Sequence, residues 1–203
     1  MTNFRSMRKL IAAKLPDIAE TAEVLTSRSL NHQPEYFLAL KTAEAIHAHF
    51  KSYRFSMEVQ LKDICEDADI HMEAVPAQYR INGLKRADLV VRHSKNGRYR
   101  HVVEFKRSGK QTSLMKDAKR LAWLCQNVQL GHKMEKNFLV AISTFGPNVL
   151  AKRTQAMAEM LEVDFPYVIL KDTYVDLEAF KSTSPKTQGK PLHAMVWEFH
   201  YKE

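Results

Sequence analysis

Two short apolar runs near the middle of the chain predict a β-hairpin. They are Ala87–Val91 and Val102–Lys106, and the polar stretch between them contains Asn96-Gly97. Runs this rich in Val and Leu build buried sheet, and Asn-Gly is a strong turn signal. Charges nevertheless interrupt both runs, at Asp88 and within Glu104-Phe105-Lys106-Arg107. A buried strand does not carry such charges without a reason.

The charges of the second run share one face of the predicted sheet. Side chains on a strand alternate between the two faces, so Glu104 and Lys106 point the same way. Val103 and Phe105 then point into the opposite layer. The register of the hairpin decides whether Asp88 joins Glu104.

A two-residue turn gives one possible register. With Asn96-Gly97 as the turn, Lys95 pairs with Arg98. Asp88 then lies opposite Phe105, on the face away from Glu104.

A three-residue loop gives the other register. With residues 95–97 as the loop and its glycine in the left-handed conformation, Ser94 pairs with Arg98. Asp88 then lies directly across from Glu104. We favour this register because it gathers two carboxylates and one ammonium on one face, where they can hold a divalent metal.

Helices and strands are expected to alternate around the hairpin. Apolar residues at near-helical spacing indicate helices at about 34–50 and 113–129. The continuous apolar run Phe138–Ile142 indicates a buried parallel strand. The remaining expected elements are a helical segment within residues 1–30, a strand near 54–61, a short helix near 62–67, a helix at 149–161, a short strand at 167–170, a loop at 181–191 and a strand at 193–200 on the sheet edge.

Asp88 on one strand and Glu104-x-Lys106 on the next resemble the signature of the PD-(D/E)XK nuclease superfamily. The family core runs helix, three strands, helix, strand, and residues 34–145 can be read in that order. The resemblance implies the restriction-endonuclease-like fold: an α/β domain with a mixed central sheet of about four core strands flanked by helices. Residues 1–33 would form a helical cap and residues 146–203 C-terminal strand additions, all within a single nuclease-like domain.

The resemblance also implies a metal site and a catalytic lysine. Asp88, Glu104 and the backbone carbonyl of Phe105 would hold Mg²⁺, with Mn²⁺ accepted in its place, since Mg²⁺ prefers hard oxygen ligands. Lys106 would position or deprotonate the attacking water and stabilise developing charge. Its ordinary pKa of about 10.4 makes it a poor base near neutrality, and nearby carboxylates without a metal raise that pKa. The alternative is that these three charges form only a salt-bridge ladder on the surface of the hairpin, which would contribute under ~1 kcal/mol to stability.

Many members of this family add a glutamate from the first core helix. We assign that catalytic and metal-binding role to Glu35, which follows Pro34 at the helix start. Glu44 in the same helix and Glu58 on the following strand are alternatives. The helix macrodipole also favours a glutamate in the first turn, which explains Glu35 without a metal.

Basic and polar residues near the hairpin are candidates for nucleic-acid contacts. Ser113 or Thr112 could cap the helix after Lys106 and leave N–H groups free for a phosphate. The candidate contact residues are Arg86, Arg107, Lys110, Gln111, Lys116, Lys119 and Arg120. A solvated surface would carry side chains of the same kind.

Composition supports a polyanionic partner. The 203 residues carry 31 Lys and Arg against 23 Asp and Glu, a formal net charge of +8, which attracts nucleic acid. Cys65 and Cys125 lie far apart in the sequence, and nothing suggests a disulfide framework or a zinc site. No run approaches the ~18 apolar residues of a membrane span. We therefore expect a cytoplasmic protein without membrane contact.

The expected function is metal-dependent hydrolysis of phosphodiester bonds, in DNA rather than RNA, by an endo- or exonuclease. Cutting both strands of a duplex requires two active sites, which is compatible with a homodimer, and a protein partner could direct the cut. The alternative is an interaction module of weak or no activity that binds nucleic acid within a larger nuclease or defence complex. All three of Asp, Glu and Lys stand at their expected places, which favours the enzyme.

Overall fold

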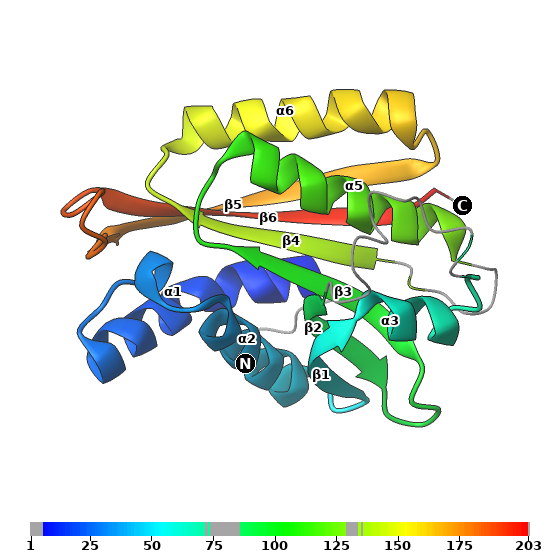
Figure 1. The fold of residues 1–203 in the computed structure, drawn as a ribbon. Helices are drawn as coiled ribbons and strands as arrows, with labels where there is room; N and C mark the ends of the chain where they lie inside the picture. Colours follow the sequence, from blue (N-terminus) through cyan, green and yellow to red (C-terminus); the bar gives the residue numbers. More distant parts are fainter. Residues whose placement is uncertain (1–5, 72, 74–85, 129–133, 135, 203) are drawn as a thin grey trace.

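The computed structural model describes residues 6–71, 73, 86–128, 134 and 136–202 (Figure 1). Its elements follow the chain in this order: α1 (Met7–Thr26), the 3₁₀ turn η1 (Leu30–His32), α2 (Glu35–His49), β1 (Tyr53–Gln60), α3 (Leu61–Asp67), β2 (Arg86–His93), β3 (Tyr99–Lys106), α5 (Gln111–Asn127), β4 (Lys136–Ser143), α6 (Pro147–Asp164), β5 (Val168–Lys181) and β6 (Pro191–Tyr201).

The strands form one mixed sheet in the order β1-β2-β3-β4-β6-β5. β3 and β4 are parallel, and the other neighbouring pairs are antiparallel. The segment from α2 to β4 has the predicted order of helix, three strands, helix and strand, with α3 added between β1 and β2. The α/β fold class predicted from the sequence is confirmed.

Helices cover both faces of the sheet (Figure 1). α1 and α2 pack on one face, where Val103 and Phe105 of β3 point into their hydrophobic core. The helices α3, α5 and α6 pack on the other face, and Val102 of β3 belongs to that core. The alternation expected along β3 is therefore confirmed, and the face that carries Glu104 is covered by α5.

The hairpin reaches the predicted register through a different turn. Leu89 pairs with Val103, so the next positions along the strands place Asp88 beside Glu104. The loop holds four residues, because the N–H of His93 donates to the carbonyl of Arg98. The predicted three-residue loop that pairs Ser94 with Arg98 is therefore wrong.

A β-bulge on β3 compensates for the longer loop. Val91 pairs with His101 and Arg92 with Tyr99, which leaves Arg100 as the extra residue. A bulge of this kind shifts the pairing by one position and restores the alternation beyond it. Gly97 has φ +69°, as its predicted left-handed conformation requires.

The C-terminal strand lies inside the sheet and not on its edge, which corrects the prediction from sequence. β6 lies between β4 and β5, and β5 runs over 14 residues, where a short strand was expected. Two of the polar residues that gave β6 an alternating pattern, His193 and Glu198, are buried and lie close to polar groups of other elements. The hydroxyl of Tyr174 lies 2.8 Å from His193 Nδ1, and Arg8 Nε lies 3.4 Å from Glu198 Oε2.

The start of α5 also differs from the prediction. The helix begins at Gln111, with Lys110 at the N-cap and no side-chain cap bond. Thr112 and Ser113 lie within the first turn, so neither caps the helix.

In the part of the chain that the structure describes, no helix is long and apolar enough to cross a bilayer.

A buried histidine makes the stability of this fold depend on pH. Burial lowers the pKa of His101 from 6.5 to about 4, and His101 Nδ1 lies 2.7 Å from the carbonyl oxygen of Lys136. As the pH falls, His101 therefore takes up a proton near pH 6.5 in the unfolded chain but only near pH 4 in the folded chain. Stability from this residue is complete above pH 6.5 and is lost as the pH falls toward 4.

We expect the free energy of unfolding to fall by about 2 kcal/mol more between pH 7 and pH 5 in the wild type than in His101→Asn. Asparagine keeps a donor near the position of Nδ1 and cannot titrate. Urea unfolding at the two pH values measures the difference. Equal losses in both proteins would show that His101 does not titrate in this way.

Candidate active site

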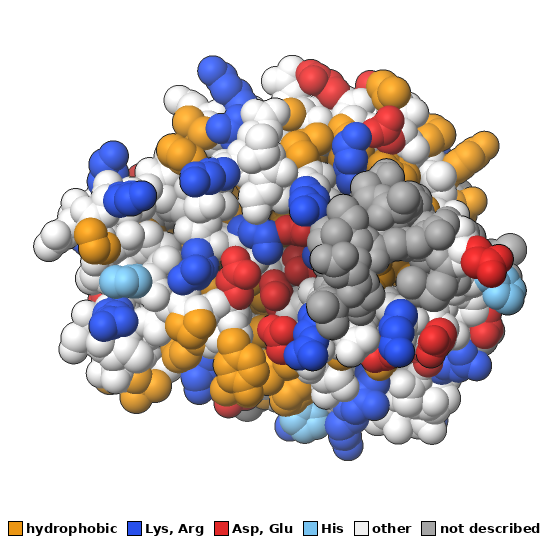
Figure 2. Space-filling view, in the orientation of Figure 1, with side chains coloured by type: hydrophobic (Ala, Val, Ile, Leu, Met, Phe, Trp, Pro, Cys, Tyr) orange, Lys and Arg blue, Asp and Glu red, His pale blue; other side chains and the backbone are white. Residues whose placement is uncertain are grey.

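The predicted charges meet at the carboxyl end of β3, where α2 and α5 approach it. β3 supplies Glu104 and Lys106, and β2 supplies Asp88 beside them. Glu35 is the first residue of α2, and α5 adds Asp117 and Arg120. Figure 2 shows acidic side chains gathered near the centre of this face, with lysine and arginine side chains around them. The site combines four carboxylates with two cations.

Glu104 is the most deeply buried carboxylate of the group, at 2% exposed. Its Oε1 lies 2.5 Å from Arg120 Nη2, and the same nitrogen lies 3.0 Å from Asp117 Oδ1. Burial raises the pKa of Glu104, and the Arg120 guanidinium opposes this rise. An ionised Glu104 therefore depends on its pairing with a cation.

Lys106 is held by one carbonyl and two carboxylates. Its Nζ donates to the carbonyl oxygen of Phe105 at 2.8 Å, and it lies 3.1 Å from Asp117 Oδ2 and 3.8 Å from Glu35 Oε1. Burial lowers the pKa of Lys106, but the surrounding carboxylates outweigh burial and raise the pKa above its usual value. The expectation that carboxylates without a metal raise this pKa is confirmed.

Asp88 is fixed by the backbone of the neighbouring strand. Its Oδ2 accepts a hydrogen bond of 2.7 Å from the N–H of Phe105. The negative charge of Asp88 also helps to raise the pKa values of Glu104 and Glu35. The structure thus brings together Asp88, Glu104 and Lys106, as their residue types and spacing predicted.

Of the three glutamates considered for the extra position, Glu35 is the one that contacts Lys106. Glu44 is exposed and pairs with Lys41 at 2.9 Å on the same helix. Glu58 is exposed on β1 with φ +55°. Desolvation raises the pKa of Glu35, Lys106 opposes this rise, and the nearby Asp88 adds to it.

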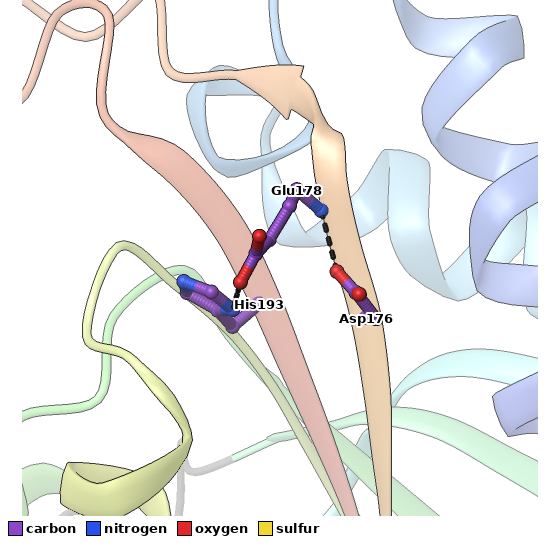
Figure 3. Close-up of side chains that lie close together, drawn as sticks. All are labelled: Asp176, Glu178 and His193. Carbon is purple, nitrogen blue, oxygen red and sulfur yellow. Dashed lines mark hydrogen bonds and ion pairs between the residues drawn. The ribbon is translucent and has the colours of Figure 1, made fainter.

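Glu35 does not complete a set of three close ligands with Asp88 and Glu104. In the described part of the chain, three acidic or histidine ligand atoms lie within 4.8 Å of one another only at Asp176, Glu178 and His193. Figure 3 shows this group on β5 and β6. The Nδ1 of His193 lies 3.8 Å from Glu178 Oε1 but is already within 2.8 Å of the Tyr174 hydroxyl. The group lies on strands other than those that carry Asp88 and Glu104.

A small cavity lies beside the Glu104–Arg120 pair. Its volume is about 10 Å³, and Arg86, Ala87 and Leu124 are among its other lining residues. That volume is close to the smallest that accommodates one water molecule. Arg86 therefore lies near the site, as its position two residues before Asp88 indicated.

The predicted nucleic-acid contacts fall into two groups. Arg120 is wrong as a surface contact, because it is 7% exposed and pairs with Glu104. Lys119 forms an ion pair of 2.7 Å with Asp164, and Gln111 accepts a bond from Arg153. Of the seven, the exposed residues are Arg86, Arg107, Lys110, Gln111 and Lys116, and Arg107 also donates to the Gln33 carbonyl.

Asp117 belongs to this cluster through its ion pairs with Lys106 and Arg120, and it was not among the residues predicted from the sequence. It lies three residues after Leu114 and four before Leu121, on the apolar stripe of α5. A charge within such a stripe is a signal of a buried partner. The charged residue at an apolar position of this helix is therefore the signal that could have identified Asp117.

The site suits a divalent cation by donor type and by charge. Asp88, Glu104 and the carbonyl of Phe105 offer the hard oxygens that Mg²⁺ prefers. Four carboxylates against Lys106 and Arg120 leave a formal charge of −2, which one divalent ion would neutralise. Two of these oxygens, Glu104 Oε1 and Phe105 O, are in contact with the two protein cations.

A scan against protein-family models found no match to this chain, and searches of curated proteins and of solved structures also found none. The class of the protein is therefore defined by its own fold and site. It is an α/β protein with a mixed six-stranded sheet and a partly buried cluster of carboxylates, one lysine and one arginine at the carboxyl end of β3.

Proposed function

We propose that the protein is a metal-dependent nuclease that hydrolyses phosphodiester bonds in DNA. The observation that carries the proposal is the meeting of Asp88, Glu104 and Lys106 on one face of the β2–β3 hairpin. A salt-bridge ladder on an exposed hairpin would not explain why Glu104 is buried with its charge compensated from α5. The resemblance to the PD-(D/E)XK superfamily supports the same reading.

Each residue has a role that follows from its chemistry. Asp88, Glu104 and the Phe105 carbonyl would hold Mg²⁺ or Mn²⁺, which when bound neutralises phosphate charge and acidifies water. Lys106 is cationic, since neighbouring carboxylates raise its pKa. As a cation it donates to the attacking water and stabilises charge that develops on the phosphate. Glu35, whose Oε1 lies 3.8 Å from Lys106 Nζ, would help to hold that cation in the site.

Exposed cations around the site would hold the DNA backbone. Arg86, Arg107, Lys110 and Lys116 are exposed, and the net charge of +8 favours binding of a polyanion. Phosphate contacts of this kind bind without reading sequence. The proposed substrate is therefore recognised by its backbone.

One observation favours an interaction module with little activity. Arg120 and Lys106 contact two of the oxygens that a metal would need. A protein that bound nucleic acid without cutting it could use these cations as permanent substitutes for the metal. Asp88 would then have no ligand role.

Incubating the purified protein with plasmid, linear duplex, single-stranded DNA and RNA tests the function. Each substrate is offered with Mg²⁺, Mn²⁺ or EDTA, and Asp88→Asn is run beside the wild type. We expect cleavage of DNA that needs the metal and is abolished in Asp88→Asn, because the substitution removes ligand charge and keeps shape. Binding of all four substrates without metal-dependent cleavage would support the interaction module instead.

The salt dependence of DNA binding tests the proposed backbone contacts. Replacing Lys110 and Lys116 by alanine should weaken duplex binding. It should also make the slope of log K against log salt shallower by up to about 1.8, because a protein that makes fewer phosphate contacts releases fewer counterions. The control variant replaces Lys51 and Lys95, which are exposed beyond the other end of the hairpin strands. Fluorescence anisotropy over a salt series gives both slopes. An equal effect in the two variants would place the DNA elsewhere.

A further inference from the structure

One guanidinium nitrogen is shared between two carboxylates at the centre of the candidate site. Arg120 Nη2 lies 2.5 Å from Glu104 Oε1 and 3.0 Å from Asp117 Oδ1. A buried cation that loses its partner is strongly destabilising. Arg120 can release Glu104 without meeting that penalty in full, because Asp117 is already in contact with the same nitrogen.

Lys106 has alternative partners in the same way. Its Nζ donates to the Phe105 carbonyl, and it also lies near Asp117 and Glu35. Asp117 therefore contacts one cation through each of its two oxygens. Asp117 can therefore retain Arg120 when Arg120 leaves Glu104, and it can retain Lys106 when Lys106 leaves the Phe105 carbonyl.

On the basis of the proposed nuclease function, we propose that Arg120 competes with the divalent cation for Glu104, and that Asp117 retains Arg120 when the cation binds. Before the cation arrives, Arg120 holds the Glu104 carboxylate in place on the face covered by α5. When a cation binds, Arg120 would release Glu104 and remain on Asp117 Oδ1. Arg120 is a positioning residue, and its contact with Glu104 lowers the apparent affinity for the cation because only the released form is competent.

Calorimetric titration with Mn²⁺ measures this competition without any cleavage assay. Arg120→Gln should bind Mn²⁺ at least tenfold more tightly than the wild type, since the competing cation is gone. Lys119→Gln is the matched control, because it removes a cation from the adjacent position of α5 that pairs with Asp164. We expect its affinity to stay within twofold of the wild type. Asp88→Asn should lose the binding.

A second measurement uses the unmodified protein, so it does not depend on whether Arg120→Gln folds. In ¹⁵N-labelled wild type titrated with Mg²⁺, the side-chain Nε–Hε signal of Arg120 should move with the midpoint that a calorimetric titration with Mg²⁺ gives. The corresponding signal of Arg98 should stay in place, because Arg98 donates to the Asp67 carbonyl at the opposite end of β3.

The outcomes separate this proposal from the proposed function. If the wild type binds neither ion, both fail together. If the wild type binds and Asp88→Asn does not, the metal site stands. An Arg120 signal that stays fixed while Mg²⁺ saturates the site, or a folded Arg120→Gln with wild-type affinity, then overturns the competition alone.

Discussion

Lys106→Ala should cut DNA about 10²–10⁴ times more slowly than the wild type at saturating substrate, the range in which a positioned proton-transfer or donor group contributes. Lys106 is the one cation that lies between the Phe105 carbonyl, Asp117 and Glu35 in the described structure. Its proposed contribution is made to the attacking water and to late charge, so its loss should affect turnover more than binding.

Single-turnover cleavage and anisotropy together measure this separation. Lys110→Ala serves as the control, since Lys110 is exposed and contributes only to binding of the backbone in our proposal. The affinity of Lys106→Ala for duplex DNA should stay close to that of the wild type. A Lys106→Ala protein that cuts at the wild-type rate would leave the nuclease without its mechanism, and the interaction module would take its place.

Phe105→Ala should lower the free energy of unfolding by about 3–5 kcal/mol, the usual cost of removing a fully buried phenylalanine. Phe105 is 0% exposed and belongs to the core beneath α1 and α2. Phe105, which lies between Glu104 and Lys106 in the sequence, thus holds β3 in the sheet from the opposite face.

Phe145→Ala is the matched control for that variant. Phe145 is 41% exposed, and the same substitution there should cost less than about 1 kcal/mol. Chemical unfolding of the two variants and the wild type gives the comparison. Equal costs would show that Phe105 does not carry the core contacts of β3, and the assignment of its neighbours to the opposite face would lose its support.

The sequence was sufficient to predict the parts of the fold that depend on local periodicity. Alternation placed Glu104 and Lys106 on one face and Phe105 on the other, and the structure has them so. The order of helices and strands from α2 to β4 also followed from local patterns. Asp88 reached its predicted place beside Glu104, although the turn that sets the register was predicted wrongly.

The register shows why such predictions can succeed through a wrong step. A one-residue slip moves every side chain of a strand to the other face. The longer loop would have caused that slip, and the bulge at Arg100 reverses it. Nothing in the spacing of apolar residues reveals a bulge, since the compensation happens in the backbone.

By itself, the sequence determined the α/β class, the hairpin and the identity of its charged residues, because strand alternation and helical spacing are local properties of the chain. Only the tertiary structure decided which charges become partners. Packing of α5 on β3 buries Arg120 against Glu104 and turns Asp117 toward Lys106. It likewise places β6 between β4 and β5. These contacts join residues distant in sequence, and burial of charge rewards only the arrangement in which each finds a partner.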